Sequence, residues 1–191
     1  MTRAAILDAA LELASRDGLE GLTIGLLADR MQMSKSGVFA HFGSREDLQV
    51  EVVREYHRRF EDEVFMPCLK KPRGLPRLLD MVDRWMRKRI HELSSGCIYI
   101  SGAVEFDDRP GAVREELVRS VQMWRMALLR GIRQAKEEHH LRGDTDPQLM
   151  LYEIYGLVLG LHHDARFLRL PESVDLAREA LNKLFQSYKA S

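Results

Sequence analysis

Apolar residues recur at helical spacing along most of the chain, and short stretches rich in Gly, Pro or polar residues separate these segments. The first segment runs from Arg3 to Ala14, with apolar residues at positions 6, 7, 10, 11, 13 and 14, and Gly18 follows where a helix would end. No segment shows the period of two that a half-buried strand needs. The pattern therefore predicts an all-α fold.

Hydroxyl residues mark the starts of further helices in the N-terminal quarter. Thr23 and Ser34 each precede a short apolar run, so their side chains are placed to cap helices, the second of which spans only Lys35 to His41. Ser44, with an acidic residue three positions later, resembles a capping box. A long fourth helix is expected from Ser44 to about Phe65.

The most helix-hostile stretch follows, because Pro67, Pro72, Gly74 and Pro76 lie within ten residues of one another. We expect a boundary between compact parts there. Beyond it the pattern predicts helices over residues 78–93, 97–106, 112–139, 147–168 and 173–188.

Composition narrows the class of protein. The chain has 191 residues, 29 Lys and Arg against 29 Asp and Glu, and 45% hydrophobic residues, which indicates a folded protein whose overall charge selects no partner. No stretch reaches the ~18 apolar residues of a membrane span, and no signal-peptide pattern opens the chain, so a cytoplasmic protein without membrane contact is expected. Cys68 and Cys97 have no zinc-like spacing and are expected to be reduced and structural, the alternative being a redox-sensing pair.

Residues 23–48 contain the most informative pattern. Two short helices joined by a tight turn are the arrangement that brings a helix end into a DNA major groove. Residues 1–60 hold eight Lys and Arg against nine Asp and Glu, so a general basic patch cannot explain DNA binding. A local explanation remains, in which Lys35, His41 and Arg45 bracket the short helix and Lys35 and Arg45 contact phosphates near its positive N-terminus.

The run TIGLLADRMQMSKSGVFAHFGSREDL, residues 23–48, resembles the DNA-binding motif of the tetracycline-repressor (TetR) family. The resemblance implies a homodimeric repressor without cofactor or catalytic activity, which leaves a near-palindromic double-stranded DNA operator when a small-molecule effector binds. It implies a three-helix helix-turn-helix domain over residues 1–48. The helix 44–65 would link this domain, as a lever, to a larger ligand-binding and dimerisation domain over residues 49–191.

Three positions depart from the common family pattern. Gln32 stands where the turn often has Gly, so it must adopt a left-handed conformation or a different turn. Phe39 replaces a common Tyr and is interpreted as a packing anchor, and Gly37 replaces a common Ser or Thr. The predicted DNA-binding residues are Thr23, Ser34, Lys35, Ser36, Gly37, Phe39, Ala40, His41 and Arg45. The alternative is that the hydroxyls are caps only and the aromatic rings are core.

The C-terminal part is rich in Met and aromatic residues, which suit the wall of an adaptable apolar pocket. A small apolar or aromatic effector is therefore expected to contact Met81, Trp85, Tyr99, Phe106, Met123, Trp124 and Tyr155. The alternative is that these side chains only fill a helical core.

The last two predicted helices are apolar or small on nearly every side, which indicates a subunit interface. The predicted dimer residues are Tyr152, Gly156, Leu159, Gly160, Leu181, Leu184, Phe185 and Tyr188. The alternative is an ordinary intramolecular core.

Other functional classes find little support in the sequence. No nucleophile–base pair, metal-ligand spacing or phosphate loop is recognisable, so no enzyme activity and no metal site are expected. The competing hypothesis is a helical ligand-binding or scaffold protein without DNA binding. Such a protein would have no use for the pattern in residues 23–48.

Overall fold

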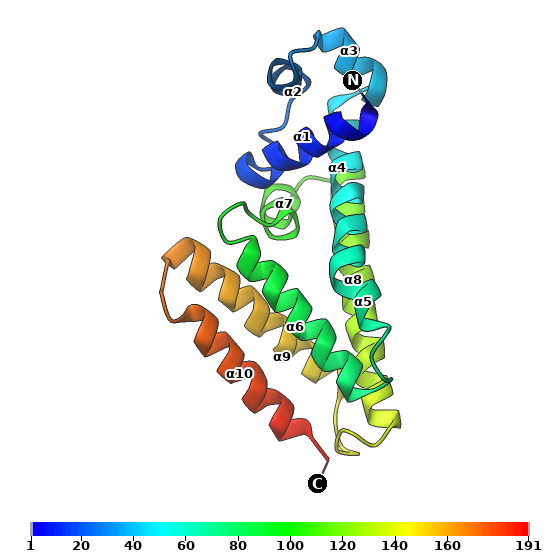
Figure 1. Ribbon diagram of the computed structural model, residues 1–191, viewed down its shortest axis with the longest axis vertical. Coiled ribbons are helices and arrows are strands. Elements are labelled where there is room, and N and C mark those ends of the chain that lie inside the picture. The colour runs from blue at the N-terminus through cyan, green and yellow to red at the C-terminus, as the bar shows by residue number, and fades with distance from the viewer. Residues whose placement is uncertain (1, 191) are drawn as a thin grey trace. The chain divides into compact units, whose positions relative to one another are not determined.

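The computed structural model describes residues 2–190, which are mostly helical (Figure 1). No strand occurs in this range, and the extended backbone pairs only at an isolated antiparallel bridge between Leu141 and Lys189. The all-α prediction is confirmed. Within residues 2–190, no helix is both long and apolar enough to cross a membrane.

The helices follow one another along the chain with short connections. Their bounds are α1 (Arg3–Asp17), α2 (Ile24–Met31), α3 (Lys35–Phe42), α4 (Arg45–Phe60), the π-helical η1 (Glu61–Phe65), α5 (Met66–Cys68), α6 (Leu75–His91), α7 (Ile98–Phe106), α8 (Ala112–Glu137), α9 (Pro147–His162), the π-helical η2 (His163–Leu168) and α10 (Ser173–Tyr188).

The predicted fourth helix and the predicted helix 147–168 each contain a change of geometry. Both are regular for most of their length and then widen into the π-helical segments η1 and η2. The helical path also continues through Pro67, which occupies the first turn of α5, where a missing backbone N–H removes no helix bond. The expected break is therefore shorter than the sequence suggests and covers only residues 69–74.

The contacts group the chain into two compact units. The first unit contains the chain up to Phe60 together with Ser95–Gln122, and the second contains Glu61–Ser94 and the chain from Met123 onward. This grouping differs from the expected division into residues 1–48 and 49–191, because it joins α7 and the first part of α8 to the N-terminal helices. The grouping depends on contacts between segments that lie far apart in the sequence. The local pattern of helix-breaking residues does not reveal such contacts.

Each unit has its own apolar core. In the first unit, Leu19, Leu27 and Val38 are fully buried among the N-terminal helices. In the second unit α9 packs against both α6 and α10 (Figure 1), and Leu78 and Val158 are fully buried. Gly74 directly precedes α6 and has a φ of 91°, and a Cβ there would lie 2.5 Å from the His140 ring, so both the backbone and the space require glycine.

Candidate functional site

The turn between α2 and α3 is built around Gln32. This residue adopts φ 54° and ψ 41°, the left-handed conformation that a non-glycine residue tolerates at a cost of ~1 kcal/mol. Its N–H and that of Met33 donate to the last carbonyls of α2, at Asp29 and Ala28. The first of the two expected geometries is therefore the one present, and α3 follows α2 after a turn of three residues.

The predicted caps are present at the starts of α2, α3 and α4. Thr23 Oγ1 accepts from the Leu26 N–H at 3.1 Å, and Ser34 Oγ accepts from the Gly37 N–H at 3.1 Å. Ser44 accepts from the Asp47 N–H at 2.9 Å, and its hydroxyl donates to the Asp47 carboxylate at 2.6 Å. These bonds fix where each helix begins.

Helix α3 has one buried and one exposed side. Val38 and Phe42 are buried, whereas Lys35, Ser36, Phe39, Ala40 and His41 are exposed. The interpretation of Phe39 as a packing anchor is wrong, because its side chain is 54% exposed while the neighbouring Val38 takes the core position. The exposed side therefore presents an aromatic ring, a hydroxyl and a methyl group together, with a lysine at the N-terminal end of the helix.

Gly37 lies where the cap leaves little space. A Cβ at this position would be 3.2 Å from Ser34 Oγ and 3.4 Å from Met33 Cε. A larger residue would crowd the oxygen that caps the helix, so glycine here suits the short first turn of α3.

Lys35 differs from the other cations of the N-terminal helices. Within residues 2–60, each arginine is close to a carboxylate, as in the pairs of Arg3 with Glu51 and Arg30 with Glu12. Lys35 has no acidic partner in that range. Its charge is therefore available to an external anion without first breaking an internal ion pair.

Arg45, the other predicted phosphate contact, is held inside the first unit. Its Nε donates to the Leu22 carbonyl at 3.0 Å, its Nη2 donates to the Glu20 carbonyl, and the Glu20 carboxylate lies 3.6 Å away. The guanidinium thus ties the start of α4 to the turn between α1 and α2. A role at phosphate would have to coexist with this structural one.

A half-open cavity of about 270 Å³ lies in the first unit between α7 and α8. Two predicted ligand residues, Tyr99 and Phe106, line it, and the Tyr99 hydroxyl is 2.5 Å from His57 Nδ1 on α4. Most of its wall is apolar. The other lining residues are Gly102, Ala103, Asp107, Arg114, Leu117, Val118, Val121 and Gln122.

These other lining residues were not among the predicted ligand residues. Arg114 is the one that adds a cation, and its Nε donates to the Asp107 carbonyl at 3.1 Å. A usable signal existed in Ala103, because a small residue between aromatic ones on a helix leaves room for a cavity, whereas the space at Gly102 is taken by the Leu117 side chain. The pairing of α7 with α8 could not be read from spacing alone.

The remaining predicted ligand residues lie in the second unit. The Trp85 ring packs 5.6 Å from that of Trp124 and 4.9 Å from that of Tyr155, and the Arg125 guanidinium lies 4.6 Å from the Tyr155 ring. Met81 is buried, whereas Met123 is exposed. Of the seven predicted residues, two therefore line the cavity of the first unit, three form an aromatic cluster in the second, and the two methionines belong to neither set.

The predicted dimer residues also divide. Tyr152 is 72% exposed, Leu159 is exposed, and a Cβ at Gly156 or Gly160 would meet no atom within 4 Å, so these four residues form an open apolar face on α9. On α10 the residues are more enclosed. Leu181 and Phe185 are buried and line a second cavity, of about 320 Å³, against α6, and Leu184 and Tyr188 are half-buried. The Tyr188 hydroxyl donates to Glu153 at 2.6 Å.

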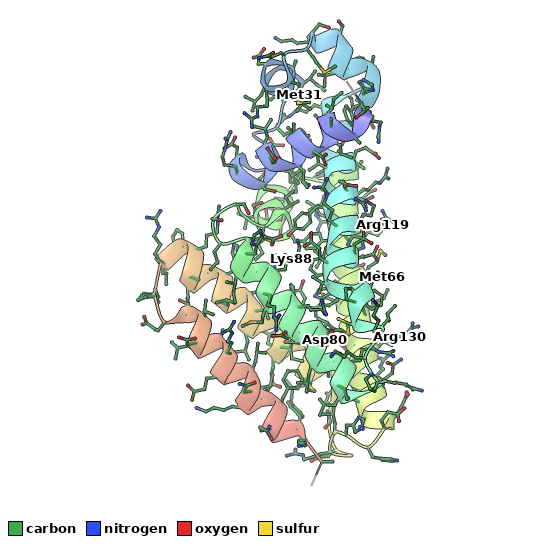
Figure 2. All side chains as sticks on the ribbon, viewed as in Figure 1. Met31, Met66, Asp80, Lys88, Arg119 and Arg130 are labelled. Carbon is green, nitrogen blue, oxygen red and sulfur yellow. The ribbon has the colours of Figure 1, made fainter. Side chains whose placement is uncertain are left out.

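The two cysteines are both buried. Burial, with a smaller contribution from Asp80, raises the pKa of the Cys68 thiol to about 12, so this thiol is not a reactive nucleophile. Figure 2 labels Asp80 on α6. Within residues 2–190, no group of three or more His, Cys, Asp or Glu side chains is arranged to hold a metal ion.

Two family models match the chain. The model described as bacterial regulatory proteins, tetR family, matches residues 6–52, and the model described as tetracyclin repressor-like, C-terminal domain, matches residues 74–181. A comparison with curated proteins finds no match.

Solved structures of transcriptional regulators share the fold over nearly the whole chain. A TetR regulator from Chloroflexus aurantiacus J-10-fl superposes with a TM-score of 0.87 at 18% identity, over 99% of this chain and 96% of that one. A regulator from Saccharomonospora viridis in complex with choline gives 0.82 at 21% identity, over 96% and 95%. AibR in complex with isovaleryl coenzyme A and operator DNA gives 0.71 at 20% identity, over 96% and 97%.

These identities are low enough that the superpositions show the fold alone. The family models add the evidence at the level of sequence, since the C-terminal model by itself matches more than half of the 191 residues. The chain belongs to the TetR family of bacterial transcriptional regulators.

Proposed function

We propose that this protein is a homodimeric repressor that binds a near-palindromic DNA operator through α3 and leaves it when a small apolar or aromatic effector binds. The observation that carries the proposal is the exposed side of α3, where Lys35 has no acidic partner within residues 2–60. Phosphate contacts supply most of the affinity of DNA-binding proteins, and base-edge contacts supply the specificity. Lys35 serves the first purpose, and Ser36 and Ala40 serve the second.

The proposed roles of the other residues follow from their positions. Thr23 and Ser34 set the helix starts, Gly37 lets the backbone approach the DNA, and exposed His41 lies near the sugar–phosphate chain. Phe39 presents a large apolar ring, which can pack on the methyl group of thymine.

The effector site that we propose is the cavity between α7 and α8. Its size is close to the lower end of the ~300–1,000 Å³ range of small-molecule sites, and its wall is mainly apolar with a few polar groups at fixed positions. The ligand-bound relatives support a ligand-responsive protein, since one was solved with choline and another with isovaleryl coenzyme A.

The dimer that we propose forms through the open face of α9. Exposed Leu149 extends the face of Tyr152, Gly156, Leu159 and Gly160, and a contiguous apolar face of this kind is typical of subunit contacts. A twofold dimer would present two copies of α3, and their spacing must match that of successive major grooves, about 34–36 Å.

The test is selection of bound duplexes from a random-sequence DNA library, followed by footprinting. The proposal expects two inverted half-sites with centres about one helical turn, or a multiple of it, apart. Selection of no sequence above background would contradict it and favour the competing hypothesis of a helical ligand-binding or scaffold protein. A single asymmetric half-site would contradict the dimeric part of the proposal.

A further inference from the structure

The turn between α1 and α2, residues 18–22, is held by side chains from α7 and the loop that follows it. Glu105 Oε2 accepts from the Glu20 N–H at 2.7 Å, and Arg109 Nη1 lies 2.7 Å from the Glu20 carboxylate. A Cβ at Gly18 would lie only 2.2 Å from Glu105 Oε1, and the φ of Gly18 is 82°. Glycine is thus required for Glu105 to reach the turn.

The same turn is tied to the start of α4. Buried Gln49 donates to the Leu19 carbonyl at 2.6 Å, and Arg45 donates to the Leu22 carbonyl at 3.0 Å. Helix α4 follows α3 directly along the chain. A displacement of the turn would therefore move α4 and, through it, α3 with its exposed side.

The residues that hold the turn are next to those that line the cavity between α7 and α8. The Arg109 guanidinium lies 6.0 Å from the centre of the Phe106 ring, which lines the cavity. A Cβ at Gly102 would lie 3.0 Å from the Leu117 methyl groups, which also line the cavity, and 3.3 Å from the Leu19 side chain. Only one layer of side chains therefore separates the cavity from the turn.

We propose that occupancy of this cavity is communicated to the DNA-reading helices through α7, by way of Glu105 and Arg109. The proposal rests on the proposed function and adds a second route to the lever expected of α4. A molecule that displaces Phe106 moves Arg109, and a shift of α7 changes the bond between Glu105 and the Glu20 N–H. Communication then requires that the bound molecule have a higher affinity for one position of α7 than for another.

The two contacts to Glu20 are unequal. Arg109 and Glu20 are both well exposed, so salt screens their ion pair and its contribution is small. The Glu105 bond is partly buried and has a carboxylate oxygen as its acceptor, which makes it the stronger contact. Glu105 is therefore the principal positioning residue, and Glu105→Gln, which keeps an acceptor oxygen, should preserve its effect where Glu105→Leu abolishes it.

The experiment fills the cavity from within the protein, so that no effector has to be known. Ala103 lines the cavity, and Ala103→Phe places a ring in it. Binding to the selected duplex is measured for this variant alone and combined with Glu105→Leu or Glu105→Gln. We expect filling to change the affinity by at least about fivefold, the lower end of typical couplings, in the wild-type and Glu105→Gln backgrounds. In the Glu105→Leu background we expect a change of less than about twofold.

A second readout needs no DNA. Hydrogen exchange of the Glu20 amide should be slow in the wild type and faster in both Ala103→Phe and Glu105→Leu, whereas the Gln32 amide should be unaffected. Val118→Phe fills the same cavity from α8 and replaces Ala103→Phe if that variant does not fold. Met126→Phe, at an exposed position outside the cavity, is the matched control and should change neither readout.

Two results would overturn the proposal. Unchanged Glu20 exchange in both filled variants would mean that the cavity does not act on the turn, whether or not the protein binds DNA. If filling the cavity changed the DNA affinity in the Glu105→Leu background as much as in the wild type, the communication would run through α4. Failure of the wild type to select DNA, with the exchange result as expected, would instead remove the proposed function and leave the contact between cavity and turn intact.

Discussion

The turn between α1 and α2 in the first unit and the C-terminal end of α6 in the second unit use charged side chains in opposite ways. In the first unit, Arg45 and Arg109 approach the carboxylate of Glu20, and all three side chains are well exposed. In the second unit, Arg89 is only 2% exposed and lies 2.6 Å from the buried carboxylate of Glu92. Exposed pairs contribute about 0–1 kcal/mol, whereas breaking a buried pair costs about 3–5 kcal/mol.

This difference indicates that the contacts in these two regions cost different amounts of free energy to break. The contacts around the turn between α1 and α2 can be remade at little cost in free energy, which suits a part that changes position. The C-terminal end of α6 holds its charges in a buried environment, where Lys88, labelled on α6 in Figure 2, also lies 3.2 Å from Glu92.

The largest expected effect concerns Glu92. Glu92→Leu removes the carboxylate that faces Arg89 and Lys88, so we expect a loss of about 3–5 kcal/mol in the free energy of unfolding. Arg109→Ala, which breaks an exposed pair in the first unit, should cost less than about 1 kcal/mol. Urea denaturation measures both. Equal losses for the two variants would remove the contrast between the two regions.

The next effect is a pH dependence in the second unit. Burial, and then the charges of Arg89 and Arg166, lower the pKa of His162 from its ordinary value of 6.5 to about 4. The unfolded chain takes up this proton first as the pH falls. The free energy of unfolding is therefore unaffected by this group above about pH 6.5. It decreases as the pH falls toward 4, by up to about 3 kcal/mol in all.

His162→Gln should flatten the stability curve between about pH 6.5 and 4. The matched control is His91→Gln, at an exposed position of α6. Unfolding free energies at several pH values give the comparison. The buried environment inferred for His162 would be contradicted if its replacement left the slope of the curve the same as in the wild type.

A smaller effect is expected at the open face of α9. A Cβ at Gly160 meets no atom within 4 Å inside the subunit, so Gly160→Leu should not disturb the isolated chain. If a partner helix packs there, overpacking should weaken the dimer by about 1–3 kcal/mol. Sedimentation over a range of concentrations measures the shift toward monomer. Gly143, which has equally open surroundings, supplies the control Gly143→Leu, and an unchanged dimer constant for Gly160→Leu would place the interface elsewhere.

Local chemistry explains what the sequence could predict. Thr23, Ser34 and Ser44 cap helices because their hydroxyls reach N–H groups only three residues away, and this relation is visible in one dimension. For Gln32 the sequence allowed either a left-handed conformation or a different turn, and the structure has the first. These short-range relations placed the helices of residues 23–48 nearly to the residue.

Relations between distant segments explain the rest. In the sequence, Arg45 is a cation beside a short helix. Only the folded turn shows that carbonyl groups more than twenty residues earlier accept hydrogen bonds from its guanidinium. Phe39 reads as core because it is aromatic, although Val38 and Phe42 already fill the buried side of α3. The cavity likewise depends on how α7 meets α8, which helical periodicity does not encode.

The central claim is that α3 reads DNA with Lys35 as its free cation, and the salt dependence of binding to the selected duplex tests it most directly. For Lys35→Ala, the slope of log K against log salt should fall by about 0.9, as for one lost phosphate contact. Arg45→Ala should leave the slope nearly unchanged and lower the unfolding free energy instead, because its guanidinium bonds within the first unit. An unchanged slope for Lys35→Ala, or a fall of about 0.9 for Arg45→Ala alone, would contradict this account.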